Sequence, residues 1–239
     1  MSGERIALVT GTSSGIGAAV AKALLEHGWQ VVGVARRTAK FQSSGYKHLA
    51  LDLADVERAS AVIEREAGAR LAERAWQRVG LVNNAALAPA GRVLTNDAVE
   101  LAHAYAVNAV MPLWLMGFVL RRRPDGAQVR IVNISSGAAQ RPFPGLATYC
   151  SSKAALRMAG MVVAAEVEDI GVFSYEPGVV DTEMQRATRE KPLEEFPWGT
   201  AFRQYHAEGR LVAPELPAAD VVKFLESERT ERFVESRRT

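Results

Sequence analysis

The stretch Thr10-Gly11-Thr12-Ser13-Ser14-Gly15-Ile16-Gly17 decides the fold expected of this chain. It follows the apolar run 6–9 and leads into 16–27, a segment of helical period, so it predicts a glycine-rich turn between a strand and a helix. Glycines are required there when a pyrophosphate must approach the backbone and bind the free N–H groups of a helix N-terminus. A tight turn without a ligand is the alternative. The flanking elements favour a dinucleotide site whose contacts are Gly11, Ser13, Ser14, Gly15, Ile16 and Gly17.

Apolar, β-branched runs alternate with longer segments of helical period along the chain. The expected strands are 6–9, 31–34, 49–53, 81–82, 129–134 and 172–175, and the expected helices are 16–27, 56–67, 98–120 and 149–170. The segment 98–120 could be one helix or two. This alternation is typical of an α/β protein with a single Rossmann-type, doubly wound parallel sheet and helices on both faces. We expect one domain, 1–239, with a substrate lid at 188–217, where four prolines interrupt an aromatic-rich segment.

Composition and charge exclude several classes of function. The net charge of +2 arises from 29 basic and 27 acidic residues spread along a chain of 239 residues. Neither a nucleic acid nor a membrane surface is therefore an expected partner. We find no apolar run that predicts a membrane span and no signal-peptide pattern at 1–10, and we expect a cytoplasmic protein. The single cysteine, Cys150, excludes an internal disulfide. The four histidines lack ligand spacing, so no metal is expected.

The end of the second expected strand indicates which cofactor would bind. The sequence there is Val34-Ala35-Arg36-Arg37, without the acidic residue that typically binds the ribose hydroxyls of NAD. Guanidinium groups of Arg36 and Arg37 can pair with a 2′-phosphate, which favours NADP(H). A solvated strand end is the alternative interpretation.

A tyrosine and a lysine at helical spacing suggest acid–base chemistry. Tyr149 and Lys153 are four residues apart and share a helix face, and the ammonium is expected to lower the pKa of the phenol toward working pH. A serine from the strand end Ile134-Ser135-Ser136 could hold a substrate oxygen against Tyr149. Taken alone, this spacing is also that of an ordinary amphipathic helix. Together with the glycine-rich turn, it predicts a carbonyl or alcohol site.

With these motifs in order, the chain resembles the short-chain dehydrogenase/reductase family over nearly its full length. The matching pieces are 10–17, Asp52-Leu53, Asn83-Asn84-Ala85-Ala86, Asn108, Ser136, Tyr149, Lys153 and 177–182. The resemblance implies that Ser136, thirteen residues before Tyr149, is the catalytic serine, and that Asn108 holds a water in a proton relay through Lys153. It also implies cofactor contacts, with Asp52 and Leu53 at the adenine, Asn83 and Ala85 at the adenosine, and Pro177, Gly178, Val180 and Thr182 near the nicotinamide, beside Tyr149 and Lys153.

Within the family, 177–185 and 209–212 resemble the sepiapterin reductase and benzil reductase branch, whose members reduce vicinal dicarbonyls or aromatic ketones with NADPH. Three positions depart from the branch or family pattern. Ser14 stands where sepiapterin reductases tend to carry arginine, and 233–239 lacks their acidic substrate anchor. Ala86 replaces a commoner glycine. The resemblance therefore implies a diketone in preference to a pterin.

The resulting prediction is an NADPH-dependent reductase of a ketone or vicinal diketone, with benzil-like aromatic substrates favoured. Its expected substrate contacts are Ser136 and Tyr149 with an apolar wall of Leu87, Phe143, Leu146, Met184 and Trp198. Alternatives that share these residues are an alcohol dehydrogenase, a sepiapterin-type reductase and an epimerase. A non-catalytic NADP(H) sensor would be expected to lose a catalytic residue, and all are present. The resemblance implies a homodimer or homotetramer, although the faces of 108–120 and 149–170, with Met111, Leu115, Met116 and Phe118, could equally be core.

Overall fold

The computed structural model, which describes residues 4–229 and 231–238, contains a central parallel sheet in the order β3-β2-β1-β4-β5-β6-β7. Its strands are β1 (Arg5–Thr10), β2 (Gln30–Ala35), β3 (Tyr46–Ala50), β4 (Arg78–Asn83), β5 (Gln128–Ile134), β6 (Ile170–Glu176) and β7 (Phe233–Arg237). From the centre of the sheet, β1 to β3 extend to one side and β4 to β7 to the other, which is the doubly wound order. The predicted α/β class with a Rossmann-type sheet is confirmed.

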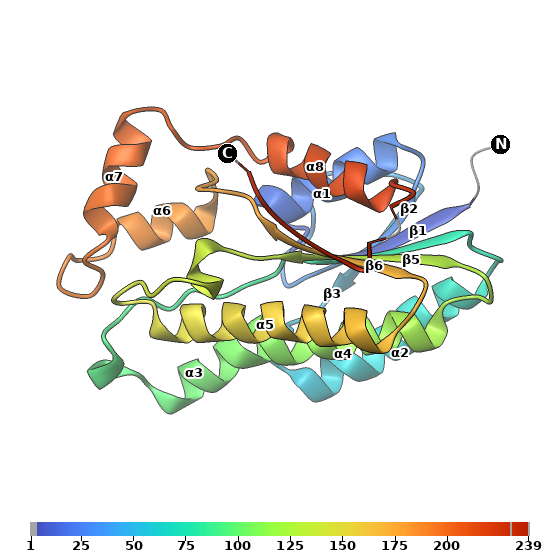
Figure 1. Cartoon of the computed structure of the whole chain (residues 1–239), viewed down its shortest axis with the longest axis horizontal. Coiled ribbons are helices and arrows are strands. Elements are labelled where there is room, and N and C mark those ends of the chain that lie inside the picture. Colours follow the sequence, from blue (N-terminus) through green and yellow to red (C-terminus); the bar gives the residue numbers. More distant parts are fainter. Residues whose placement is uncertain (1–3, 230, 239) are drawn as a thin grey trace.

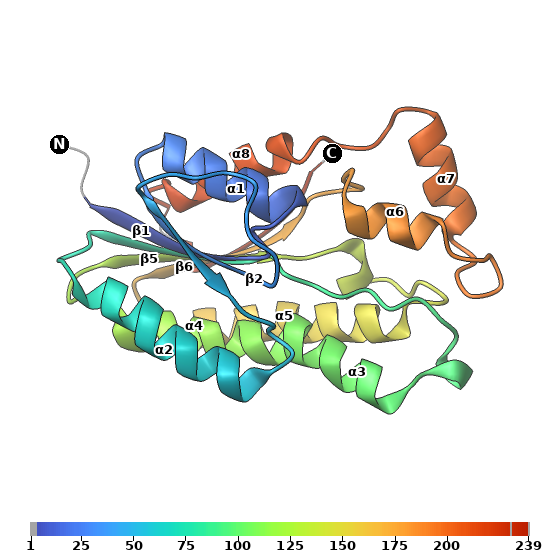
Figure 2. The same cartoon turned by 180° about the vertical axis from the view of Figure 1, so that it is seen from behind.

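Helices cover both faces of this sheet (Figures 1 and 2). One face carries α1 (Gly15–Glu26) and α8 (Glu215–Leu225), and the other carries α2 (Val56–Ala72), α4 (Met111–Arg122) and α5 (Ala147–Glu166). Each face has its own cluster of buried apolar residues. Because both faces are covered, the inner strands are apolar at successive positions instead of alternating, which is why their sequences can be recognised.

The expected helix 98–120 is two helices joined by a wider turn. α3 (Ala98–Tyr105) continues through the π-helical turn η2 (Ala106–Val110) into α4, and Asn108 lies in that turn. Contrary to our expectation, the run Ala98–Arg122 is long and apolar enough to span a membrane, but half of its most apolar window is buried. The four residues considered for a subunit interface are fully buried against the sheet, so they are core: Met111, Leu115, Met116 and Phe118.

The ends of several other strands and helices differ from the sequence-based expectation, at the edges of the sheet and near prolines. β3 ends at Ala50, so the apolar residues 51 and 53 belong to the loop that follows it. β7 was not predicted because it is an edge strand with mainly exposed side chains and no apolar pattern. α8 begins inside the segment expected to be a lid: Pro217 lies in its first turn, where proline is tolerated, and is buried. The residues from 215 onward therefore belong to a core helix.

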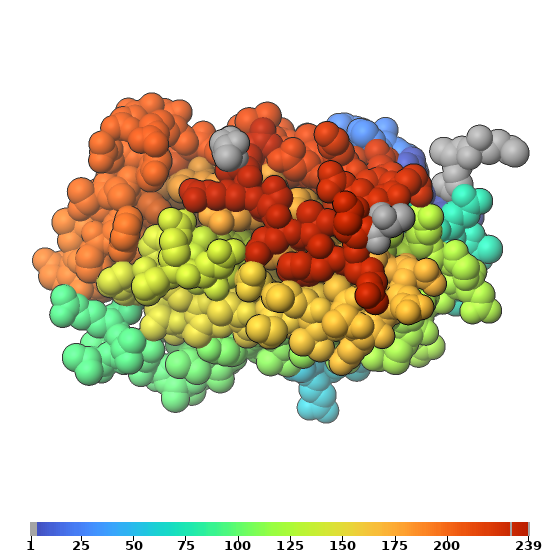
Figure 3. All heavy atoms as spheres, in the orientation of Figure 1, coloured from blue at the N-terminus to red at the C-terminus, as the bar shows by residue number. Residues whose placement is uncertain are grey.

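The carboxyl ends of the strands all reach one end of the molecule, where α6 (Glu183–Arg189) and α7 (Gly199–Ala207) project beyond the sheet (Figure 1). The C-terminal strand β7 runs toward that same end, and its residues lie at the surface in Figure 3. In doubly wound folds, ligands bind at this edge, beside the point where the strand order reverses. The fold thus places the glycine-rich turn after β1, the residues after β5 and the start of α5 around one space.

Candidate active site

The glycine-rich turn connects β1 to α1 with two residues in left-handed conformations, Gly11 (φ +77°) and Gly15 (φ +57°). A Cβ at Gly15 would lie 3.0 Å from Thr182 Cγ2, so a larger side chain would close the space between this turn and the loop after β6. Ser14 is the N-cap of α1, but its side chain makes no capping hydrogen bond, and the first turn contains no acidic residue. The N–H groups and positive dipole of α1 are thus available to an anion.

Gly17 has a different role from the one expected. It does not line the cavity. A Cβ at this position would lie 2.3 Å from the Gly11 carbonyl oxygen and 2.4 Å from Asn84 Nδ2. Gly17 therefore permits close packing of α1 against its own turn and against the loop after β4, instead of a direct approach by a pyrophosphate.

Arg36 and Arg37 lie at the end of β2 and line the cavity, together with Asp52 and Leu53 from the loop after β3. The Arg36 guanidinium lies 3.8 Å from Asp52. Arg37 forms an ion pair of 2.5 Å with Glu183 of α6 and lies 3.5 Å from the Ser14 hydroxyl. Both arginines are exposed, and each already has a carboxylate partner, which the sequence pattern did not reveal.

The loop after β4 corrects one predicted contact. Asn83 is buried beneath the sheet edge, where its amide donates to Asn133 Oδ1 at 2.8 Å, and it does not line the cavity. Its neighbour Asn84 lines the cavity instead and donates to the Thr10 carbonyl at 2.8 Å. The Thr10 hydroxyl accepts from the backbone N–H groups of Asn84 and Ala85, each at 3.0 Å, which holds this loop against the glycine-rich turn.

Ser136, Tyr149 and Lys153 meet at the wall of the cavity, as predicted from sequence. Ser136 follows β5 and its Oγ accepts from the Ala138 N–H at 3.2 Å. Tyr149 and Lys153 lie in the first two turns of α5, with Lys153 Nζ 5.6 Å from the centroid of the tyrosine ring. Ser136 lies near enough to Tyr149 to lower the pKa of its phenol, and it lines the cavity beside it.

The pKa of Tyr149 shifts in the opposite direction to our expectation. Burial raises it to about 12 and outweighs the hydrogen bond with Ser136, which lowers it. Lys153 is itself buried, which lowers its pKa to about 8, and its ammonium donates to the Ile134 carbonyl at 2.7 Å. The ammonium is thus directed at a backbone carbonyl of β5. Tyr149 therefore holds its proton at neutral pH.

Asn108 is buried, and its side chain is fully used by neighbouring groups. Its Oδ1 accepts from the Leu87 N–H at 2.8 Å, and its Nδ2 donates to the Leu87 carbonyl at 2.7 Å and to Ser152 Oγ at 2.9 Å. Asn108 does not line the cavity. It fixes Leu87, which does line the cavity.

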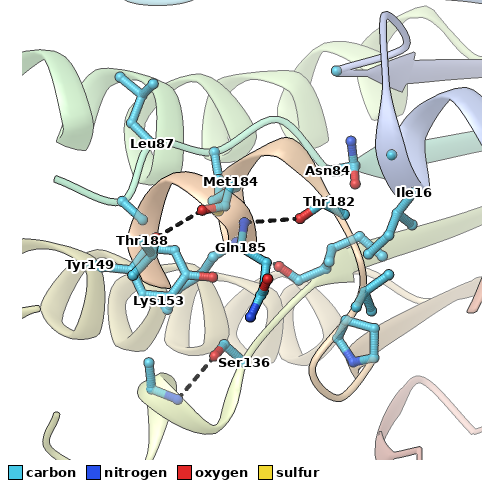
Figure 4. Close-up of a pocket in the computed structure, with 18 of the residues that line it drawn as sticks. Ile16, Asn84, Leu87, Ser136, Tyr149, Lys153, Thr182, Met184, Gln185 and Thr188 are labelled. Atoms are coloured by element: carbon cyan, nitrogen blue, oxygen red, sulfur yellow. Dashed lines mark hydrogen bonds between the residues drawn. The ribbon is translucent and has the colours of Figure 1, made fainter. Parts of the chain in front are cut away.

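A cavity of about 750 Å³ joins these groups to an apolar wall. It is lined by the predicted substrate residues Leu87, Phe143, Leu146, Met184 and Trp198, and by the loop residues Pro177, Gly178, Val180 and Thr182. Phe143 and Trp198 meet edge to face, with centroids 5.2 Å apart. Figure 4 shows Met184 and Leu87 on one side of the cavity and Ser136 on the other, with Tyr149 between them.

Comparisons with known proteins agree with this geometry. Residues 5–193 match the short chain dehydrogenase family. The chain belongs to that family. It is 31% identical over 225 residues to a benzil reductase ((S)-benzoin forming) of Bacillus subtilis (strain 168), covering 92% of both chains. A sepiapterin reductase of Meriones unguiculatus is 38% identical over 153 residues, 58% of each chain. The crystal structure of the KRED1-Pglu enzyme superimposes with a TM-score of 0.80 at 29% identity, covering 96% of this chain and all of that one.

Membership establishes this short chain dehydrogenase as an oxidoreductase that acts between CH–OH and C=O groups with a nicotinamide cofactor. The similarity to the sepiapterin and benzil reductase branch, inferred from 177–185 and 209–212, is confirmed by these relatives. The residues present fit the cofactor, because the left-handed Gly11 and Gly15 line the cavity at the uncapped α1 N-terminus, where an anion can approach the backbone.

Several residues of this short chain dehydrogenase were not predicted to belong to the site. Glu176, at the end of β6, lines the cavity and lies 3.9 Å from Arg141 and 3.3 Å from Arg237 of β7. No motif marks Arg237, since β7 carries no recognisable pattern. Gln185, on α6, also lines the cavity and is buried. Gln185 falls within the stretch 177–185 that resembles the reductase branch. The sequence does not show that its side chain is buried at the cavity.

Proposed function

We propose that this short chain dehydrogenase is an NADP(H)-dependent carbonyl reductase that reduces a ketone or a vicinal diketone, with benzil-like aromatic substrates favoured. The observation that carries the proposal is the meeting of Ser136, Tyr149 and Lys153 at the wall of a largely apolar cavity. In a reduction the carbonyl oxygen must gain a proton, and the Tyr149 hydroxyl is the group beside Ser136 that can supply it.

The residues around the cavity divide into cofactor and substrate contacts. The α1 N-terminus with Ser13, Ser14 and Ile16 would hold the pyrophosphate, and Asp52 with Leu53 the adenine. Pro177, Gly178, Val180 and Thr182 would position the nicotinamide, which supplies the hydride when bound. In the substrate half, Tyr149 donates its proton to the carbonyl oxygen and Ser136 hydrogen-bonds that oxygen. Lys153, whose pKa near 8 allows it to exchange a proton at working pH, returns one to Tyr149.

The preference for NADP(H) rests on Arg36 and Arg37. They are the cationic groups at the end of β2, and both line the cavity. A guanidinium binds a 2′-phosphate through charge-assisted hydrogen bonds. Their present partners, Asp52 and Glu183, hold them at the cavity and would compete with that phosphate for the guanidinium groups.

The aromatic substrate class rests on the cavity wall and on the segment over it. Trp198 packs on Phe143, and the backbone of Glu195 lies so close to Gly145 that a Cβ there would meet its oxygen at 2.5 Å. We propose that residues 188–213 form the substrate lid. Apolar side chains with few polar groups suit an aromatic ketone better than a sugar or a charged acid.

We further propose that the protein is a cytoplasmic homodimer or homotetramer. The apolar side chains of α4 and α5 that remain exposed are candidates for the contact: Leu113, Met158, Met161 and Val162. Contiguous exposed apolar side chains are a feature of association surfaces. Light scattering of the eluting protein would measure the number of subunits, and a monomer would contradict this proposal.

The experiment that tests the function is the loss of NADPH absorbance with benzil, run beside sepiapterin, simple aromatic ketones and an NADH control. We expect turnover of benzil with NADPH and much slower turnover with NADH. Demonstrated binding of NADPH with no turnover of any carbonyl would contradict the proposed activity and favour a cofactor-sensing role.

A further inference from the structure

Gln185 is a buried amide in the substrate half of the cavity that none of the catalytic roles uses. It lies in the first turn of α6, where its backbone N–H donates to Thr182 Oγ1 at 3.2 Å. Its side chain is 7% exposed and lines the cavity. Within the described residues, 4–229 and 231–238, its Nε2 has no hydrogen-bond partner, although its Oε1 accepts from Arg189 one helical turn later. Buried amide donors are normally paired, so this one requires an explanation.

Arg189 determines which way the amide faces. A guanidinium has only donors, so the group that it contacts must be the amide oxygen. The nitrogen, with its two hydrogens, must therefore face away from Arg189. Figure 4 shows the Gln185 side chain extending from α6 toward the side of the cavity where Ser136 and the Tyr149 hydroxyl lie. The protein thus holds an unpaired donor buried in the cavity wall, on the side of its catalytic hydroxyl groups.

The named side chains beside Gln185 on the substrate wall offer no other donor to a second substrate oxygen. Leu87, Phe143 and Met184 are apolar side chains. The Thr188 hydroxyl already donates to the Met184 carbonyl at 2.9 Å. Ser136 and Tyr149 serve the oxygen that is reduced, so an additional oxygen on the substrate has no partner among these residues.

We propose that Gln185 Nε2 donates a hydrogen bond to the second oxygen of a vicinal dicarbonyl, the oxygen next to the carbonyl that is reduced. The inference rests on the proposed function and makes it more specific, because it separates dicarbonyls from monoketones of the same shape. A site that hydrogen-bonds an oxygen discriminates strongly against analogues that lack it, since its own buried polar group is then left unpaired. Gln185 is accordingly a specificity residue that touches the substrate.

The test compares 1-phenylpropane-1,2-dione with propiophenone, which lacks the second carbonyl oxygen. For Gln185→Leu we expect kcat/KM for the dione to fall about 10- to 100-fold, the range for a hydrogen bond lost from a buried site, and that for the monoketone to change less than about threefold. Gln185→Glu, which offers an acceptor, should show the same selective loss. Gln204→Leu, at an exposed glutamine of α7 outside the cavity, is the matched control.

Binding measurements distinguish this inference from the proposed function. The dissociation constants of the dione and of the monoketone are measured by calorimetry in the Tyr149→Phe background, with and without Gln185→Leu. A selective weakening of the dione supports the role of Gln185 even if the wild-type protein reduces neither compound, a result that would refute the proposed function alone. Equal losses for both compounds, a change in NADPH affinity of similar size, or no effect of Gln185→Leu would each overturn the inference.

Discussion

Substitutions of Arg37 and of Glu183, which form an ion pair, should change the affinity for NADPH in opposite directions. If Arg37 binds the 2′-phosphate of NADP(H), Arg37→Ala removes a charge-assisted hydrogen bond, which contributes about 1.5–3 kcal/mol when well formed. Arg37 is 64% exposed, so we expect the lower end of that range, close to a tenfold weaker binding of NADPH, with NADH unchanged. Glu183→Gln instead releases Arg37 from its competing carboxylate. An exposed ion pair contributes at most about 1 kcal/mol, so NADPH should bind up to about fivefold more tightly.

The assay is a fluorescence titration of each variant with NADPH and with NADH. Because both cofactors share everything except the 2′-phosphate, the ratio of their dissociation constants isolates that group. Arg121→Ala, an exposed arginine at the end of α4, is the control for a general loss of positive charge. If Arg37→Ala weakens both cofactors equally, or if Glu183→Gln weakens NADPH, the arginine does not bind the 2′-phosphate and the argument for NADP(H) fails.

Burial and close packing lead to three further predictions. In the direction of reduction, kcat should fall as the pH rises through about 8, because Lys153 loses its proton there while Tyr149, with a pKa of about 12, does not; a flat alkaline profile would count against the lysine relay. The unfolded chain binds more protons than the native protein between about pH 8 and Lys153's ordinary pKa, so this residue's contribution to stability should rise with pH across that window. Gly17→Ala should lower the melting temperature, at a cost of about 1–3 kcal/mol, because its Cβ would lie 2.3 Å from the Gly11 carbonyl oxygen. Gly68→Ala, inside α2 and with room for a Cβ, should stabilise by about 0.5–1 kcal/mol, and equal melting temperatures for the two variants would contradict this packing argument.

The sequence predicted those parts of the fold that leave a periodic pattern. The inner strands are apolar throughout because helices cover both faces, and their positions were predicted within a few residues. β7 escaped prediction because an edge strand has few buried side chains. The prolines of 188–217 indicated a loop, yet Pro217 occupies the first turn of a core helix, where proline costs little.

In the candidate site, too, the residues that a local pattern marks could be predicted, whereas those that depend on tertiary contacts could not. Tyr149 and Lys153 could be recognised because they share one helix, and Ser136 because it ends a strand. Asn83 was predicted to contact the cofactor, but Asn84 lines the cavity instead. The sequence does not show which of two successive side chains faces the cavity. Gln185 and the partners of the arginines depend on packing between distant segments, and the pKa of Tyr149 depends on burial. None of these is encoded in the spacing of residues.

The central claim is that Tyr149 donates the proton in a carbonyl reduction, and replacement of its hydroxyl tests it most directly. Tyr149→Phe removes one oxygen and keeps the ring that packs at the start of α5. We predict that this variant binds NADPH nearly as tightly as the wild-type protein but loses reduction of benzil by at least about 100-fold, the scale of a general acid. Benzil reduction by Tyr149→Phe at a rate close to that of the wild type would contradict the account.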